Sequence, residues 1–199
     1  MRKNAVTLVE LLLATALLGT ILLAVGVFEL FSLRMYHKQD YHKEVSSEAV
    51  FIISHLSKYI QNAVGDKNNQ GISVSWTSPC KCTGKAGSSC NCYVDIRNDT
   101  NNTPSDYSDD ITRRYAYNST DYELRFYPEY SGPTSDPNQY DVLSRKVVDC
   151  QFSFDIGTPQ IFKIDKLKLR HDPKRSASQD NPEVEISSIN LFSFPHSLN

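Results

Sequence analysis

The 199-residue chain lacks the features by which several common protein classes are recognised. It contains no nucleophile elbow, phosphate-binding loop or dinucleotide fingerprint, and therefore carries no enzyme signature. Its formal net charge is -2, so no overall positive field recommends nucleic acid as a partner. The five histidines lack metal-ligand spacing. The acidic stretch from Asp95 to Asp110 lacks EF-hand order, so a solvated loop is favoured there over calcium binding, and no cofactor is expected.

Proline is absent before Pro79, and the beginning of the chain is strongly apolar. The run from Val6 to Phe28 contains one charged residue, Glu10. A helix needs about 20 apolar residues to cross a bilayer core, so this run predicts a single membrane span. Arg2 and Lys3 would keep the N-terminus in the cytoplasm. A cleaved secretory signal fits less well, because the run is too long and no small-residue cleavage site follows it.

The first ten residues resemble the cleavage and methylation signal of type IV prepilins and type II secretion pseudopilins. The resemblance lies in the basic leader, in Thr7, Leu8, Val9 and Glu10, and in the long apolar run that they begin. At the junction, Ala5 and Val6 stand where the family usually has Gly and Phe. It implies that a prepilin peptidase cuts between Ala5 and Val6 and methylates the new amine of Val6. It also implies that Glu10 neutralises the terminal amine of a neighbouring subunit during assembly on an inner-membrane platform. The alternative is an ordinary signal anchor with no role in assembly.

Helical periodicity continues beyond the apolar run. Six apolar residues recur at steps of three and four: Val45, Ala49, Ile52, Leu56, Tyr59 and Ala63. The pattern predicts one helix from about Val6 to Val64, with Gly65 as its terminator. The predicted organisation is a leader (1–5), a membrane and assembly helix (6–28), its amphipathic continuation (29–64) and a β-rich head (65–199).

The head reads as short strands separated by turn residues. Seven strands are predicted, over 71–76, 92–97, 112–118, 122–127, 148–156, 162–169 and 184–194. The clearest is the fifth, in which Val148, Cys150, Phe152, Phe154 and Ile156 alternate with polar residues and predict one buried face. The expected fold class is α+β: a long helix packed on an antiparallel sheet, as in pilins. The segments 147–154 and 163–169 are also similar to J-type minor pseudopilins and W-type minor pilins.

Four of the five cysteines are spaced symmetrically around a short loop. They are Cys80, Cys82, Cys90 and Cys92. In a hairpin over 80–92, Cys82 would face Cys90 and Cys80 would face Cys92, which would permit two disulfides in an oxidising compartment. Four cysteines allow three pairings, so connectivity stays open. A four-thiolate zinc site is the alternative, although its paired ligands usually have two to four residues between them rather than one.

These observations favour a non-enzymatic subunit, a minor pilin or pseudopilin, that binds other pilins through its N-terminal helix. It would begin in the inner membrane and end in a periplasmic or extracellular filament. One alternative is a tip adhesin or substrate receptor that uses the cysteine hairpin and the loop 128–138. Another is DNA uptake, which would require a local basic patch, formed by Arg113, Arg114, Lys163, Lys166, Lys168, Arg170, Lys174 and Arg175.

Overall fold

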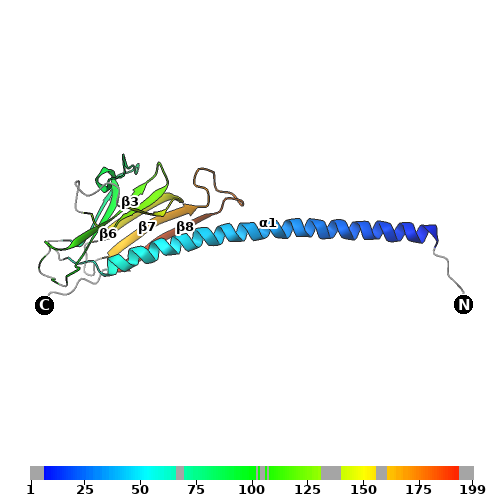
Figure 1. Cartoon of the computed structure of the whole chain (residues 1–199), viewed down its shortest axis with the longest axis horizontal. Coiled ribbons are helices and arrows are strands. Elements are labelled where there is room, and N and C mark those ends of the chain that lie inside the picture. Colours follow the sequence, from blue (N-terminus) through cyan, green and yellow to red (C-terminus); the bar gives the residue numbers. More distant parts are fainter. Residues whose placement is uncertain are drawn as a thin grey trace. The chain divides into compact units, whose positions relative to one another are not determined.

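The computed structural model describes residues 7–65, 70–101, 103, 106, 108–130, 140–155 and 161–192. These residues form one long helix, one short 3-10 turn and eight strands, so the fold class is α+β as predicted (Figure 1). The chain divides into two compact units, residues 1–40 and 41–199. Helix α1 runs from Leu8 to Gln61, so it begins in the first unit and ends in the second.

The strands of the second unit form two antiparallel sheets, in the orders β1-β2-β3-β4-β5 and β6-β7-β8. Within each sheet every strand pairs with its neighbour in sequence, so both are meanders. The bounds are β1 Ile72–Trp76, β2 Cys92–Asn98, β3 Ile111–Asn118, β4 Glu123–Tyr127, β5 Asp141–Ser144, β6 Val147–Asp155, β7 Ile161–Arg170 and β8 Glu183–Phe192. Only β5, a strand of four residues, has no counterpart among the predicted strands.

The second half of α1 packs on these sheets through the predicted stripe. Val45, Ala49, Ile52 and Leu56 are completely buried and belong to one apolar cluster with residues from both sheets. Ile60, which the predicted stripe omitted, is also completely buried. Tyr59, which the predicted stripe included, is only partly buried at the margin of this core. The buried stripe therefore passes through Ile60 instead of Tyr59.

Helix α1 ends at Gln61, three residues before the predicted end at Val64. The cause is Asn98 at the end of β2, whose side-chain amide donates to the carbonyl oxygens of Tyr59 at 3.0 Å and Asn62 at 2.7 Å. Ala63 then forms an antiparallel bridge with Asn98. A carbonyl in the last turn of α1 and one just beyond it thus find a partner on a strand, and Gly65 does not terminate the helix.

The burial pattern of β6 differs from the strict alternation predicted for it. Val147, rather than Val148, is completely buried, while Cys150 and Phe152 are buried as expected. The register with β7 shifts between Val147 and Asp149, which is the mark of a β-bulge. An extra residue at this point reverses which side chains face the core. The predicted final residue, Ile156, lies outside the described residues.

Candidate functional site

The first described turn of α1 shows a local role for Glu10. Its carboxylate accepts hydrogen bonds from the backbone N–H and the hydroxyl of Thr7, both at 2.9 Å. The Thr7 hydroxyl lies 3.4 Å from the backbone N–H of Glu10. A Thr and a Glu three residues later that satisfy each other's N–H groups form a capping box, so this pair begins the helix. Ala5 and Val6, the predicted cleavage and methylation residues, lie outside the described residues.

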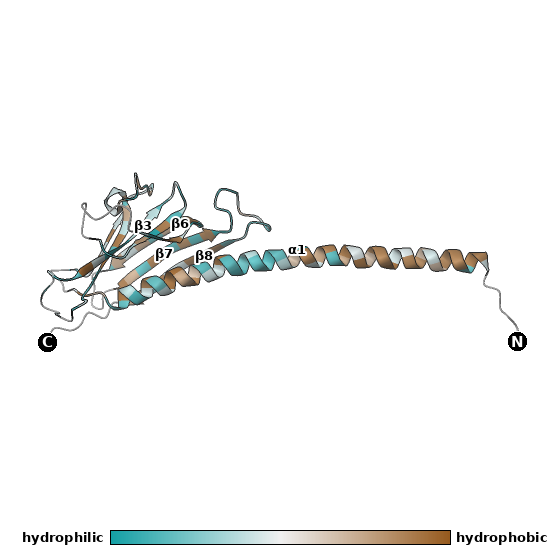
Figure 2. Ribbon diagram, in the orientation of Figure 1, coloured by the Kyte–Doolittle hydropathy of each residue, from teal (hydrophilic) through white to brown (hydrophobic). Residues whose placement is uncertain are grey.

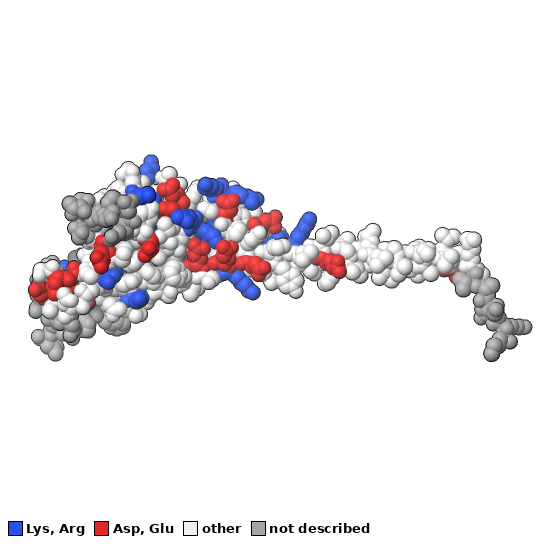
Figure 3. Space-filling view, viewed as in Figure 1, with Lys and Arg blue, Asp and Glu red and all other residues white. Residues whose placement is uncertain are grey.

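The helix that follows Glu10 is apolar on all sides. No charged residue occurs between Glu10 and Glu29, and its leucines are exposed, as Leu12, Leu17 and Leu22 illustrate at 61%, 63% and 64%. Figure 2 shows that hydrophobic residues predominate along the beginning of α1, and Figure 3 shows how few charges this part carries in that view. Leu8–Gln61 is the one described helix long and apolar enough to cross a membrane. Its first half could therefore anchor the chain by a single span.

The four clustered cysteines form two disulfides in the head. Cys80 is bonded to Cys92, with Cα atoms 5.2 Å apart, and Cys82 is bonded to Cys90, with Cα atoms 4.0 Å apart. This is the pairing that a hairpin predicts, and Cys82 and Cys90 indeed form an antiparallel bridge. Because all four sulfurs are in disulfides, the structure does not contain the alternative four-thiolate zinc site. Cys150 is a free, buried thiol, and burial raises its pKa well above the usual value.

The loop between the inner cysteines, residues 83–89, is held against the neighbouring strands. It contains the short 3-10 turn Gly87–Ser89. Three of its carbonyl oxygens accept hydrogen bonds from strand side chains: Gly84 from Arg125 at 2.7 Å, Lys85 from Tyr127 at 2.8 Å, and Gly87 from Arg114 at 2.9 Å. The sequence analysis did not predict these contacts, because the donors lie on β3 and β4, far along the chain.

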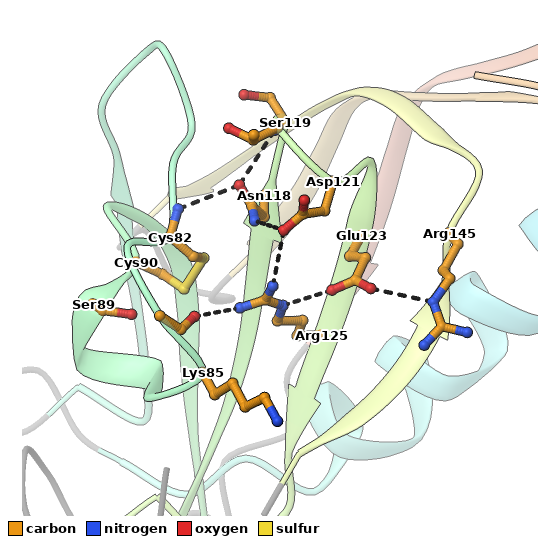
Figure 4. Close-up of polar contacts among 12 residues, drawn as sticks. Cys82, Lys85, Ser89, Cys90, Asn118, Ser119, Asp121, Glu123, Arg125 and Arg145 are labelled. Carbon is orange, nitrogen blue, oxygen red and sulfur yellow. Dashed lines mark hydrogen bonds and ion pairs between the residues drawn. A yellow bond between two sulfur atoms is a disulfide. The ribbon is translucent and has the colours of Figure 1, made fainter. Parts of the chain in front are cut away.

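Carboxylates orient the two arginines that hold this loop. Arg125 lies 2.9 Å from Glu123 and 3.3 Å from Asp121 (Figure 4). Arg114 binds both oxygens of Asp95 at 2.6 Å. Burial opposes the charge of Arg114, but the hydrogen bonds and charge of Asp95 outweigh it and raise the guanidinium pKa. Both arginines are buried, so their charges hold the fold rather than face a ligand.

The acidic stretch 95–110 has its described carboxylates engaged with protein groups. Asp95 binds Arg114, as described above, and Asp110 lies 3.3 Å from Arg97. Asp109 accepts hydrogen bonds from Asn101 and Thr103. Across the described part of the chain, no group of three or more His, Cys, Asp or Glu side chains is placed to hold a metal ion.

Five of the eight basic residues considered for DNA binding form ion pairs with carboxylates. Arg114 binds Asp95. On the second sheet, Lys163 pairs with Asp155 and Lys166 pairs with Asp149. The remaining pairs join Lys168 to Glu183 and Glu185, and Arg170 to Glu183. Alternating signs of this kind do not create the positive field that phosphate binding requires.

A further cluster, which the sequence analysis missed, joins α1 to two turns of the head. Glu44 lies 2.5 Å from the ammonium of Lys146 and 3.1 Å from Nδ1 of His171. The ring of Tyr41 stacks on His171 with centroids 4.1 Å apart. The hydrogen bond from Lys146 lowers the pKa of Glu44. Partners separated by about a hundred residues leave no local pattern in the sequence.

No protein-family model, curated protein or solved structure matches this chain.

Proposed function

We propose that this protein is a non-enzymatic subunit, a minor pilin or pseudopilin, of a filament of the type IV pilus or type II secretion class. In this proposal residues 1–5 are removed, Val6 becomes the N-terminal residue, and α1 bundles with the helices of neighbouring subunits. The carrying observation is the placement of Glu10, in the first turn of a helix that is apolar on every side until Glu29. An intramembrane carboxylate is costly to maintain and marks function by default.

The contrast within α1 supports an assembly role for its first half. The second half buries a single stripe against its own head, so that stripe needs no other partner. The first half has apolar residues around its whole circumference and is exposed throughout. A helix of this type needs apolar surroundings on all sides, either lipid or other helices. A filament core would supply the second of these once the subunit leaves the bilayer.

The capping box offers a competing explanation for Glu10, because a helix start alone accounts for a Glu at this position. The two roles have different chemical requirements. Capping needs an acceptor, which glutamine also supplies. Pairing with a neighbouring amine needs the negative charge, which glutamine lacks. The Glu10→Gln variant therefore separates the two roles.

We expect Glu10→Gln to insert into the membrane normally but to enter filaments roughly tenfold less efficiently, a difference of about 1.4 kcal/mol. Membrane insertion is measured by alkaline extraction, and filament entry by the fraction recovered in sheared fibres. Glu29→Gln is the matched control, because it removes the same charge at the other end of the apolar segment. Thr7→Ala, which weakens the cap but keeps the charge, should assemble better than Glu10→Gln. Normal assembly of Glu10→Gln would defeat the proposed role of the charge.

Mass spectrometry of the mature N-terminus tests the pathway independently of assembly. A methylated Val6 supports the proposal, whereas a retained leader supports the ordinary signal anchor. Two alternative functions have weaker support. For an adhesin or receptor, the cysteine loop 83–89 is a described surface, but most of the loop 128–138 lies outside the described residues. DNA uptake has less support because most of its basic residues are already paired with carboxylates.

A further inference from the structure

A cleft of about 300 Å³ opens in the head where the first sheet meets the second. Its walls come from the end of β1 and the turn after it, from the end of β3, and from β6. Trp76, the single tryptophan of the chain, lines this cleft together with the disulfide-bonded Cys80. We propose that the cleft is a binding site for a neutral saccharide. The proposal goes beyond the filament role and does not depend on it.

The indole of Trp76 is packed against two other aromatic rings. The ring of Trp76 lies nearly parallel to the buried ring of Tyr117, at 6°, with centroids 6.5 Å apart. Its other neighbour is Phe152, in edge contact with centroids 5.1 Å apart. The Tyr117 hydroxyl donates to the carbonyl of Val147 at 3.2 Å. Trp76 itself is half-buried, so only part of its ring is accessible at the cleft.

The turn that closes one side of the cleft is also fixed. The Asn91 amide donates to the carbonyls of Thr77 at 2.7 Å and Pro79 at 3.0 Å. The Ser119 backbone N–H donates to the carbonyl of Cys80 at 3.0 Å, which ties the turn to β3. Together with the Cys80–Cys92 bridge, these bonds pre-form the cleft. A pre-formed site loses less conformational entropy on binding.

Polar groups along the cleft retain unused hydrogen-bonding capacity. Among the described residues, the Gln151 side chain, the Ser78 hydroxyl and the Trp76 indole N–H have no hydrogen-bond partner. Asp149 lies two residues before Gln151 on β6, and Oδ2 of its carboxylate lies 2.7 Å from the ammonium of Lys166. The cleft therefore offers amide, hydroxyl and carboxylate groups around one aromatic face.

This combination matches the chemistry of a sugar ring. A pyranose has an apolar C–H face that packs on an indole, and hydroxyls at its edge that bond to amides and carboxylates. A proline-rich peptide would instead require a groove lined by several exposed aromatic rings, and Tyr117 is buried here. The described lining of the cleft contains no Lys, Arg or His side chain that would favour an acidic sugar. The volume, at the lower end for ligand pockets, suits one or two rings.

The single tryptophan makes the test direct. We would titrate the full-length protein in detergent micelles with chitotriose and with maltotriose, and record the emission of Trp76. We expect a saturable change in emission with at least one of them, and a Kd on the order of 1 mM. Trigalacturonic acid and hexaproline serve as the acidic and peptide probes, and neither should produce a saturable change.

Two variants locate the binding. Gln151→Ala should weaken binding roughly threefold or more, because a hydrogen bond to the ligand is lost. Gln61→Ala is its matched control, since Gln61 is an exposed glutamine on α1 outside the cleft. Trp76→Leu should abolish binding as followed by saturation-transfer NMR of the sugar protons, with circular dichroism to establish that the head remains folded.

Three results would overturn the assignment: no change with either neutral trisaccharide, a saturable change with hexaproline or trigalacturonic acid alone, or equal affinity in Gln151→Ala and the unmodified protein. Filament entry is measured separately, so a failure here would leave the proposed filament role unaffected.

Discussion

The two halves of α1 contain similar apolar side chains in opposite surroundings. Leu17 in the first half is 63% exposed, whereas Leu56 in the second half is completely buried. The difference follows from their patterns, because apolar residues surround the first half but recur only every three or four positions in the second. A stripe can be covered by one head, while a fully apolar helix needs lipid or several helices. The comparison teaches that one continuous helix can have two separate sources of stability.

The largest effect is expected when one leucine is truncated in each half of α1. Leu56→Ala should lower the free energy of unfolding of the head by about 2–5 kcal/mol, because it leaves a cavity in a packed core. Leu17→Ala should change it by less than about 0.5 kcal/mol, because Leu17 is exposed and does not belong to that buried cluster. Urea unfolding in detergent, followed by Trp76 fluorescence, measures both. Similar losses for the two variants would contradict the separation.

A smaller effect is expected where the second half of α1 ends. Asn98→Ala should cost about 1–3 kcal/mol, because it removes the partner of the Tyr59 and Asn62 carbonyls and of the Arg113 guanidinium, which donates to Asn98 at 2.9 Å. Asn101→Ala is the control, since Asn101 is exposed and its hydrogen bonds among the described residues are to Asp99 and Asp109 in its own loop. The same urea experiment applies. If the two asparagines proved equivalent, the end of the helix would not depend on β2.

The smallest effect is expected from the charge of Glu44, in the second half of α1, on the stability of the head. The pKa of Glu44 lies below its usual value of 4.5 in the folded head, so the unfolded chain binds this proton more readily. Its contribution to stability is therefore present at neutral pH and lost as the pH falls below about 4.5 toward the folded-state pKa. Glu44 is half-exposed, so the effect is modest.

The measurement is the urea midpoint of the head between about pH 7 and about pH 3. Glu44→Gln should flatten the part of this profile that lies below about pH 4.5. Glu129→Gln, which changes an exposed carboxylate with no ion pair among the described residues, is the control and should leave the profile unchanged. A profile that is the same in Glu44→Gln and the unmodified protein would show that the cluster around Glu44 does not contribute.

Much of the head was predictable because its signals are local. The alternation of apolar and polar residues, with turn residues between the segments, predicted every described strand except β5. The four residues of β5 are too few to show an alternating pattern. The symmetrical cysteine spacing predicted a hairpin in which Cys80 would face Cys92 and Cys82 would face Cys90, but it left the disulfide connectivity open. The structure forms these two pairs. The exposed apolar helix and the position of Glu10 also follow from local order alone.

Errors appeared where two distant elements compete for one position. The predicted stripe of α1 included Tyr59, but Ile60 is the residue buried in the core. The difference arises because packing against the sheets determines which side of the helix is covered. Alternation placed Val148 inside, but the bulge opposite β7 brought Val147 there instead. The clamp on the cysteine loop could not be predicted, since Arg114, Arg125 and Tyr127 reach it from other strands.

The amino-acid order by itself determined that the chain begins with an apolar helix carrying one carboxylate near its start, continues as an amphipathic helix, and ends in a disulfide-bonded β-rich head. Periodicity, capping and short-range cysteine spacing all act over a few residues and can be read along the chain. Only the tertiary structure decided where α1 stops, which residues hold the cysteine loop, and that Trp76, Asp149 and Gln151 line one cleft. Those features arise where β-strands distant in sequence meet, and no local pattern encodes that meeting.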